Sequence, residues 1–441
     1  MIRNKLSGTL YLALKEYAAL VIFAIVYVLI IGRIRFKIPI WIAMSSGAVL
    51  MIAFQIIDVE SAAKSIQLDV LVFLFSMFSI VSALDRSGLL KLVAAKMMFK
   101  AKTPDLLLMV IVVGMGLLSA FLVNDTIALM GIPLIIYISK HINVRPVVFL
   151  ISLAFGITVG SAMTPIGNPQ NLLIAIQSGI PLPFTNFLKF LAIPTMVNLF
   201  LTWYILKIYF KKDLMMISHN YQDNAILQSI KIENPRLAKM SLIILLAIIV
   251  GFFVSEVLHF LHVFDISISI IALIGATALY AISSKRYEIL KSVNYTVLVF
   301  FVAMFVVTSA LWSSGAISLF MQYLPIPNPN NMLQSSAVIS TCSITLGQIL
   351  SNVPFVALYD HVMLANGFTS THITQWVMLA ASSTIAGNLT ILGAASSIII
   401  IQAAESKGVK AFTFLEFLKI GSIITLVNIL VYYLFVVLLG I

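Results

Sequence analysis

The chain has 441 residues, of which 61% are hydrophobic and only 10% are charged, and its formal net charge is +11. Soluble globular proteins carry about 25% charged residues, so this composition excludes that class and predicts an all-α polytopic membrane protein. Long apolar runs follow one another, whereas the strands of a transmembrane barrel are short and alternate in hydrophobicity. The lone Cys342 permits no internal disulfide and no thiolate cage for a metal.

Apolar runs of membrane-spanning length occur throughout the chain. The predicted spans are 17–32, 38–57, 68–84, 146–178, 187–206, 240–258, 266–283, 293–311, 373–404 and 414–440, with two hairpins at 106–139 and 332–365.

The basic residues gather in alternate loops between these spans. If the loop with Arg33, Arg35 and Lys37 is cytoplasmic, most of the 27 Lys and Arg residues fall on the cytoplasmic side. The positive charge therefore indicates membrane orientation and implies no nucleic-acid partner. Arg3, Lys5 and Lys15 do not fit this scheme, so the side of the amino terminus stays open.

The first hairpin turns at Asn124-Asp125, between two apolar arms. This turn lacks the Gly, Lys or Ser residues of an ordinary exposed loop, which favours a re-entrant tip over a tight external turn. A carboxylate at membrane depth is costly and suggests ion or proton handling by Asp125. The alternative is a helix N-cap at a wetted turn.

The segment TPIGNPQNLLIA, residues 164–175, interrupts an apolar run that has no charged residue from Pro146 to Leu188. Pro165 and Pro169 remove backbone donors and Gly167 permits φ > 0, so we expect the helix to stop near Thr164 and restart near Pro169. Freed carbonyls can ligate a cation, and the NH groups that open the second half-helix can hold an anion. A proline kink without any ligand is the alternative reading.

The chain contains an internal repeat. VLVFLFSMFSIVSALDRSG at 70–88 matches VLVFFVAMFVVTSALWSSG at 297–315 without a gap. We predict a first repeat at 1–210, a cytoplasmic linker at 211–239 and a second repeat at 240–441. Each repeat has five crossings and one hairpin, and five is odd, so the second repeat is inverted, as in secondary transporters.

The second repeat has its own hairpin tip and its own break. The tip is Ser351-Asn352-Val353-Pro354, and the break is GNLTILGAASS at 387–397. In this break Thr390, Gly393 and Ser397 correspond to Thr164, Gly167 and Asn171. Paired irregular segments in an inverted repeat point to a transporter site.

The segments VNDTIAL, TPIGNPQNLLI, LSNVPFVAL and GNLTILG resemble the arsenite-permease and citrate-transporter-like branch of the ion transporter superfamily. That superfamily also includes divalent anion/sodium symporters and sodium/proton antiporters of the same fold. The resemblance covers about residues 20 to 440. It implies a static scaffold and a transport domain of hairpins and broken helices that moves as an elevator, often within a homodimer.

The resemblance also implies substrate- or ion-binding residues in both repeats. They are Asn124, Asp125, Thr126, Thr164, Gly167, Asn168 and Asn171 in the first, and Ser351, Asn352, Pro354, Asn388, Thr390, Gly393 and Ser397 in the second. Dicarboxylate symporters have Ser-Asn-Thr at both tips. The carboxylate of Asp125 therefore weakens the prediction of a citrate or dicarboxylate substrate. Ser397 stands where the arsenite-permease branch often has Asn.

The leading hypothesis is a secondary active transporter of a small anion or oxyacid in the inner membrane of a prokaryotic cell. Arsenite or antimonite efflux coupled to protons or sodium is its most specific form. The alternatives are a sodium/proton antiporter, a citrate or dicarboxylate symporter, and a channel. No enzyme motif and no ATP-binding loop occurs in the sequence, so energy must come from an ion gradient or a separate ATPase subunit. No cofactor is implied. His259 and His262 near Glu256 could also form a metal site, although solvated polar helix ends are commoner.

Overall fold

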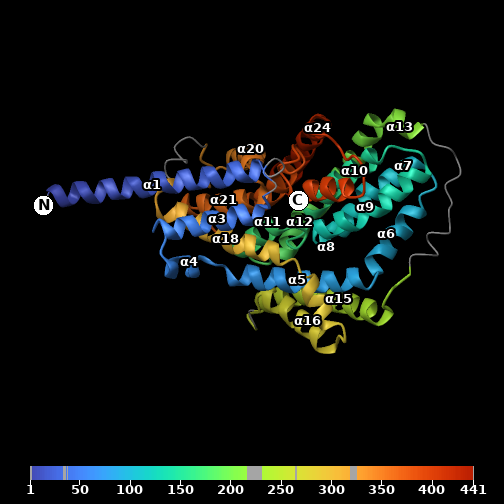
Figure 1. Ribbon diagram of the computed structural model, residues 1–441, viewed down its shortest axis with the longest axis horizontal. Helices are drawn as coiled ribbons and strands as arrows, with labels where there is room; N and C mark the ends of the chain where they lie inside the picture. The colour runs from blue at the N-terminus through green and yellow to red at the C-terminus, as the bar shows by residue number, and fades with distance from the viewer. Residues whose placement is uncertain are drawn as a thin grey trace.

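The computed structural model describes residues 2–32, 36, 38–215, 231–263, 266–317 and 325–440, with only the backbone at residues 2–13 and 31. The loop residues Arg33, Arg35 and Lys37, and residues 216–230 of the predicted linker, lie outside the described residues. The described chain contains helices, turns and loops and no strand, so the prediction of an all-α protein is confirmed (Figure 1).

Within the described residues, six helical segments are long and apolar enough to cross a membrane. They are Leu68–Arg86, Pro104–Phe121, Pro183–Tyr209, Pro235–Phe260, Tyr295–Ser313 and Phe414–Leu438. Shorter apolar helices accompany them, including the half-helices at the breaks. Many large apolar side chains on the outside, such as Ile243, Leu246 and Val250 of one span, are exposed. These are lipid-facing surfaces of a membrane protein.

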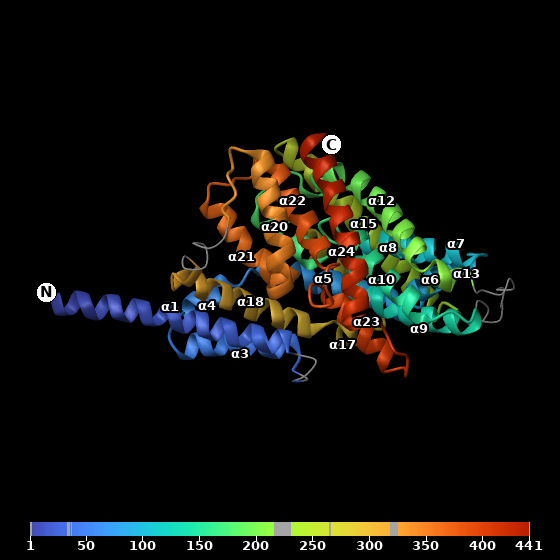
Figure 2. The ribbon, with the colours of Figure 1, turned by 90° about the horizontal axis from the view of Figure 1, so that it is seen from above.

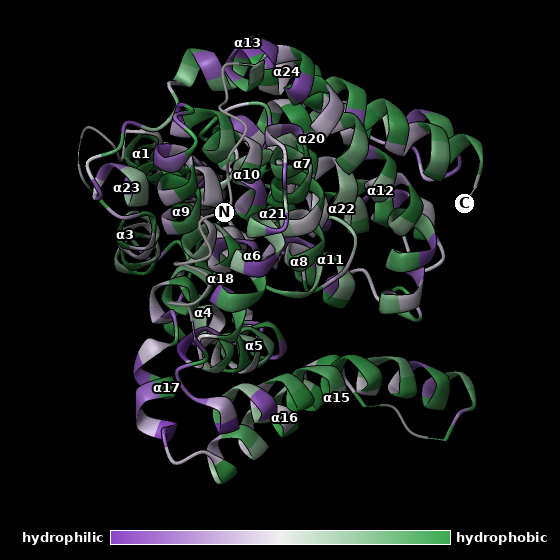
Figure 3. Ribbon diagram, turned by 90° about the vertical axis from the view of Figure 1, so that its right-hand side faces the viewer, coloured by the Kyte–Doolittle hydropathy of each residue, from purple (hydrophilic) through white to green (hydrophobic). Residues whose placement is uncertain are grey.

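One group of helices contains the segments that repeat in the sequence. It comprises α1 (Ile2–Ile31), α3 (Ile40–Ala53), α4 (Val59–Ser65), α5 (Leu68–Arg86), α15 (Pro235–Phe260), α16 (Ile268–Ile282), α17 (Arg286–Ser292) and α18 (Tyr295–Ser313). Helix α3 packs on α18, and α5 packs on α16 and α15. Figure 3 shows α15 and α16 as an apolar layer along one side. We call this group the scaffold helices.

The first hairpin and broken helix follow α6 (Leu89–Phe99). The hairpin consists of α7 (Pro104–Met109), a π-helical turn (Val110–Gly114), α8 (Met115–Phe121) and α9 (Asn124–His141). The broken helix consists of α10 (Pro146–Ser161) and α11 (Pro169–Gln177), and α12 (Pro183–Tyr209) and α13 (Lys211–Met215) follow.

The second hairpin and broken helix close the chain. They are α20 (Met332–Leu350), α21 (Asn352–Ala365), α22 (Ile373–Ala386) and α23 (Ala395–Glu405), followed by α24 (Phe414–Tyr432) and a π-helical end (Tyr433–Leu438). In Figure 2 α20, α21 and α22 lie on one side of α24 and α8, α9 and α10 on the other. Helix α23 packs on α9, and α11 packs on α21, so each broken helix reaches the hairpin of the other repeat.

Glycines bring the first hairpin and its broken helix into backbone contact. A Cβ at Gly156 would lie 2.7 Å from the Val112 carbonyl oxygen, and a Cβ at Gly160 would overlap the backbone of Gly116. Close approach through small residues is the usual way in which helices associate inside a membrane. The α8–α10 pair is therefore a rigid support for the first break.

The predicted inversion of the two repeats can be tested at the bases of the hairpins. Lys140 and Asn330 are both exposed there, whereas the native Cys342 is buried. With an impermeant maleimide on intact cells, we expect Asn330→Cys to be labelled from outside and Lys140→Cys only after the cells are opened. Labelling of both positions from the same face would exclude the inverted topology.

Candidate functional site

The first break is closed by two asparagine side chains. Asn168 is the N-cap of α11: its side-chain oxygen accepts from the Asn171 backbone N–H at 2.9 Å, and its amide nitrogen donates to Ser161. Asn171 donates to the carbonyl oxygens of Ser161, Ala162 and Thr164 at 3.1 to 3.3 Å. These bonds satisfy carbonyls that the interrupted helix leaves without partners.

Thr384 of α22 joins this network across the repeats. Its hydroxyl donates to the Asn171 side-chain oxygen at 3.1 Å and accepts from the Asn168 side-chain nitrogen at 3.1 Å. Gln170 lies 3.5 Å from the same hydroxyl. Sequence reasoning did not select Thr384, although the polar run Ser382-Ser383-Thr384 directly before the second break was a signal for it.

Two details of the first break differ from expectation. Helix α10 ends at Ser161, ahead of Thr164, because the Asn171 amide takes the last carbonyls. Gly167 does not adopt a positive φ. A glycine is required there for space, because a Cβ would overlap the Ser161 carbonyl group.

The second break is tied to its hairpin by a different set of bonds. The Thr390 hydroxyl donates to the Gln348 side-chain oxygen at 2.8 Å, and Gln348 in turn donates to the Ala386 carbonyl at 2.8 Å. The Gly393 carbonyl accepts from the Asn352 backbone N–H at 3.3 Å. The turn of the second hairpin therefore lies against the break, inside the protein. In the first repeat Thr164 donates to the Ala120 carbonyl of its own hairpin.

Ser351 holds this hairpin tip in a strained conformation. Its φ is 64° and its ψ is 157°, a region that is essentially restricted to glycine and costs about 1–3 kcal/mol for other residues. Its hydroxyl is 3.4 Å from the Gly393 carbonyl. Such strain persists only where the surroundings enforce it, and strained residues of this kind cluster at active sites, ligand clamps and switch regions.

Several polar side chains at the second break and its hairpin tip are buried and have atoms without partners among the described residues. Among the described residues, no hydrogen-bond partner is present for the Asn352 side-chain oxygen, either polar atom of the Asn388 side chain, or the hydroxyls of Ser396 and Ser397. Asn388 and Ser397 are fully buried. Orphaned buried polar groups are costly, and they indicate a ligand, an ion or water. The side-chain amides of Asn168 and Asn171 at the first break are hydrogen-bonded within the protein. The second break has side-chain donors and acceptors that have no partner among the described residues.

A cavity of about 880 Å³, here called the central cavity, lies between the scaffold helices and the two tips. Five residues of the predicted site line this cavity, namely Asn124, Asp125, Ser351, Asn352 and Gly393. The polar residues Thr158, Gln170, Thr384 and Ser396, which are not among the predicted site residues, also line it. Asp125 and Glu405 are its acidic residues, and none of the described residues that line it is Lys, Arg or His. Of the other predicted residues, Pro354 also lines the cavity. Seven more lie outside the lining: Thr164, Gly167, Asn168, Asn171, Asn388, Thr390 and Ser397.

A second cavity of about 780 Å³, here called the vestibule, opens on the basic side of the protein. Asp125 and Asn294 line both cavities, so the two adjoin there. Thr126 lines the vestibule alone. The lining includes Arg86, Lys91 and Lys285, so the positive-inside rule predicts that the vestibule faces the cytoplasm.

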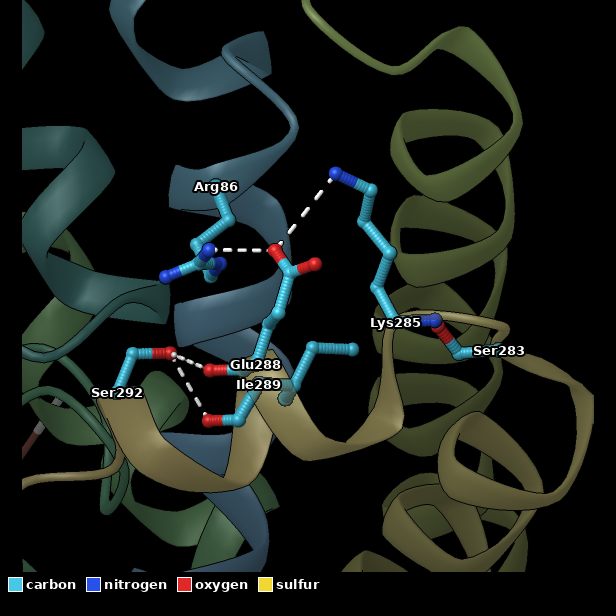
Figure 4. A network of polar contacts seen from close by, with 6 residues as sticks. All are labelled: Arg86, Ser283, Lys285, Glu288, Ile289 and Ser292. Carbon is cyan, nitrogen blue, oxygen red and sulfur yellow. Dashed lines mark hydrogen bonds and ion pairs between the residues drawn. The ribbon is translucent and has the colours of Figure 1, made fainter.

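Three of the charged residues at the vestibule, Arg86, Lys285 and Glu288, are paired with one another (Figure 4). Arg86 of α5 donates to the Glu288 carboxylate at 2.6 Å, and Lys285 lies 3.6 Å from the same oxygen. The hydrogen bond from Arg86 and the charge of Lys285 lower the pKa of Glu288. Ser82 donates to the Ser292 carbonyl at 3.1 Å, which also joins α5 to α17.

Glu256, which was considered with His259 and His262 as a metal site, has a structural role. The Glu256 carboxylate accepts hydrogen bonds from the backbone N–H groups of Phe184 and Thr185 at 2.6 and 3.1 Å, and from the Thr185 hydroxyl. It therefore caps the start of α12, where the helix dipole favours a negative charge.

We expect the two breaks to respond differently to loss of an asparagine. Asn171→Ala removes hydrogen bonds to three buried carbonyls, each worth about 1–3 kcal/mol when left unsatisfied, so it should lower the melting temperature and the yield of folded protein. Asn388→Ala removes no bond within the protein and should keep the wild-type melting temperature while lowering transport about tenfold. Wild-type transport by folded Asn388→Ala would contradict a ligand role for the second break.

The membrane-spanning helices, the two hairpins with their broken helices and the adjoining cavities are the features of a multi-pass membrane transporter. Residues 25–381 match the model of the CitMHS citrate transporter family, and the chain belongs to that family. This confirms the resemblance to the arsenite-permease and citrate-transporter branch. The protein is thus a transporter and not an enzyme, and its family and its six apolar membrane-spanning helices within the described residues indicate a multi-pass protein of the inner membrane.

Similar proteins are known in bacteria, an amoeba and a plant. An uncharacterized transporter of Mycobacterium tuberculosis is 26% identical over 93% of this chain and 95% of its own. The putative transporter arsB of Dictyostelium discoideum is 24% identical over 97% and 93%. The silicon efflux transporter LSI3 of Oryza sativa subsp. japonica is 26% identical over 81% and 84%. Among solved structures, the Alcanivorax borkumensis YdaH transporter gives a TM-score of 0.49 at 14% identity, covering 84% of this chain and 85% of that chain.

Proposed function

We propose that this protein is a secondary active transporter of a small oxyacid that crosses the membrane in its uncharged form, of the arsenite or silicic acid kind, in exchange for a cation. The observation that carries the proposal is the charge of the central cavity. Its described lining has two acidic residues, Asp125 and Glu405, and no basic one.

A citrate or dicarboxylate ion would be poorly accommodated in this lining. Proteins bind such anions with Arg or Lys, whose donors match a carboxylate. Here Asp125 stands at the first tip and would repel a carboxylate substrate, and the partially desolvated site strengthens that repulsion. Arsenous and silicic acids are undissociated near neutral pH, and their hydroxyl groups can donate to Asp125 and accept from side-chain amides.

The relatives support the same substrate class. One similar protein is named a putative transporter arsB and another a silicon efflux transporter, and the elements arsenic and silicon both form neutral hydroxylated acids in water. The family name refers to citrate, so a citrate symporter is the main competitor. A sodium/proton antiporter is the second, because an acidic cavity also suits a cation.

An elevator movement suits the contact between the second hairpin and the scaffold helices. Leu20 and Phe23 of α1 and Leu311 of α18 face Phe355 and Leu358 of α21 across a narrow crevice that has no polar lining. Such a contact can slide without breaking hydrogen bonds. The breaks and tips, by contrast, are joined by many hydrogen bonds and would move together, within a protomer or within a homodimer.

Flux through purified protein in liposomes tests the substrate class. We expect arsenite and silicic acid to accumulate against their own gradients when a proton or sodium gradient is imposed, with no accumulation of citrate. Liposomes without protein serve as the control for leak through the membrane. Accumulation of citrate but not arsenite would contradict the proposal, and sodium or proton flux without any solute would favour the antiporter.

Asp125 should be required for this transport, because among the described residues it is the acid that lines both cavities. Asp125→Asn keeps the size of the side chain but removes a charged acceptor, whose hydrogen bonds contribute about 1.5–3 kcal/mol, so arsenite flux should fall about 10- to 100-fold. Glu405→Gln is the matched control, because Glu405 is exposed at the rim of the same cavity and its loss should change flux little. Equal effects of the two changes would show that only the overall negative charge matters.

A further inference from the structure

Helices α12 and α24 pack against each other along a row of buried polar side chains, here called the polar seam. Its members are Thr195, Asn198 and Thr202 of α12 and Thr425, Asn428 and Tyr432 of α24. All six residues are at most 2% exposed, and none of them lines the central cavity or the vestibule. The polar groups of the seam therefore depend on partners inside the protein.

The two sides of the polar seam are equivalent in the internal repeat. The segment FLKF at 187–190 corresponds to FLKI at 417–420. The same alignment places three pairs of residues at equivalent positions: Thr195 and Thr425, Asn198 and Asn428, and Thr202 and Tyr432. Thr195 contacts Tyr432 and Thr202 contacts Asn428, so the two helices run antiparallel. In such a pair, the counterpart of the Thr195–Tyr432 contact is a contact between Thr425 and Thr202.

Direct hydrogen bonds join one end and the centre of the polar seam. The hydroxyl oxygens of Thr195 and Tyr432 are 2.6 Å apart. The Asn198 side-chain nitrogen donates to the Asn428 backbone carbonyl at 3.1 Å, and the Asn428 side-chain nitrogen donates to the Thr202 hydroxyl at 3.4 Å. These bonds hold α12 and α24 together across the two repeats.

The other end of the polar seam lacks the corresponding bond. The Thr425 hydroxyl has no hydrogen-bond partner among the described residues. Its counterpart Thr195 bonds to a tyrosine, whereas the equivalent partner position for Thr425 is held by Thr202. A threonine lacks the ring that carries the Tyr432 hydroxyl across the seam. The difference in side-chain length therefore accounts for the missing bond.

Two more oxygen atoms of the polar seam are without partners among the described residues, namely the side-chain oxygens of Asn198 and Asn428. In each amide this oxygen shares a carbon with the nitrogen that bonds across the seam, so both oxygens lie between the two helices. Amide oxygens only accept hydrogen bonds, whereas the Thr425 hydroxyl can donate one. The seam thus offers two acceptors and one donor.

We propose that the polar seam binds a water molecule beside Thr425, where the repeat would place the hydroxyl of a tyrosine. This water donates to the side-chain oxygens of Asn198 and Asn428 and accepts from the Thr425 hydroxyl. Buried waters typically make about three hydrogen bonds to polar groups that are otherwise unsatisfied. The water joins α12 to α24 at the end of the seam that lacks a direct bond.

A cation fits these groups less well than water does. It would contact the oxygens but leave the proton of the Thr425 hydroxyl without an acceptor, and a buried cation needs a negative charge to offset its desolvation. Among the described helices in contact with α12 and α24, the acids lie at helix ends, away from the seam. They are Glu416 at the start of α24, Glu256 at the start of α12, and Asp105 and Asp213 beside the end of α12.

The bridged seam also fixes α24 against the second break. A Cβ at Gly421 of α24 would overlap the Asn388 carbonyl group. Gly421 precedes Asn428 by about two helical turns, so the two residues share a face of α24. The water site therefore helps to position the backbone of the second break although it lines neither cavity.

Thr425→Val tests the water through the sign of its effect on stability. If the hydroxyl donates to a water, the isosteric valine removes a hydrogen bond, and the melting temperature of the purified full-length protein should fall by a few degrees. An unpartnered hydroxyl would itself cost stability, so an unchanged or higher melting temperature would overturn the inference. Thr195→Val is the matched control, because it breaks the direct bond to Tyr432 and should lower the melting temperature in either case.

A density map of the wild-type protein tests the site without any variant. At a resolution that shows ordered waters, a peak should lie within about 2.5–3.2 Å of Thr425 Oγ1 and of the Oδ1 atoms of Asn198 and Asn428. A map that shows other ordered waters but no peak here would overturn the inference. Neither test needs a transported solute, so their outcome is independent of the proposed function.

Replacing sodium by choline in the buffer distinguishes water from a cation. The difference in melting temperature between wild-type protein and Thr425→Val should be the same in both buffers, because a neutral ligand is present in each. A difference that disappears without sodium would identify a cation site and overturn the inference.

Discussion

The structure depends on one constraint, which is that every backbone N–H and C=O inside the membrane needs a partner. Two helices are interrupted at their centres, and each interruption frees such groups. The first break meets the constraint with side chains, because the Asn171 amide alone reaches three carbonyl oxygens. The second break meets it with its hairpin, through Gln348 and the backbone of Asn352. Each solution also fixes where a hairpin tip stands relative to the central cavity.

These two solutions give the repeats unequal roles. In the first break the side chains of Asn168 and Asn171 are occupied by the protein, and Thr384 links them to the second repeat. In the second break, the side chain of Asn388 and the hydroxyl of Ser397 remain without partners. The two repeats thus share a backbone plan but differ in bonding: the first break is tied by its own side chains, whereas the second has side chains without partners among the described residues. The central cavity meets the vestibule at Asp125, which belongs to the first hairpin tip.

The helical membrane fold could be predicted from the sequence because apolar runs and paired polar interruptions are local patterns. The positions of the breaks followed from Pro165, Pro169 and the polar run at 387–397. The role of Gly167 did not, because its requirement comes from the Ser161 carbonyl across the loop and not from its own φ. Nor could sequence separate Asn171 from Asn388, since only packing decides which amide is already bonded. Thr384 was missed for the same reason: it lies within an apolar helix, and its significance depends on the neighbours that the fold supplies.

Asp125 and Asp360 differ in what surrounds them. Asp125 lies where two cavities meet, so it can contact solute and water in the present conformation. Asp360 is fully buried and lines neither cavity. A carboxylate can bind a solute or exchange a proton only where solute or water reaches it, and of these two acids Asp125 alone meets that condition in this conformation.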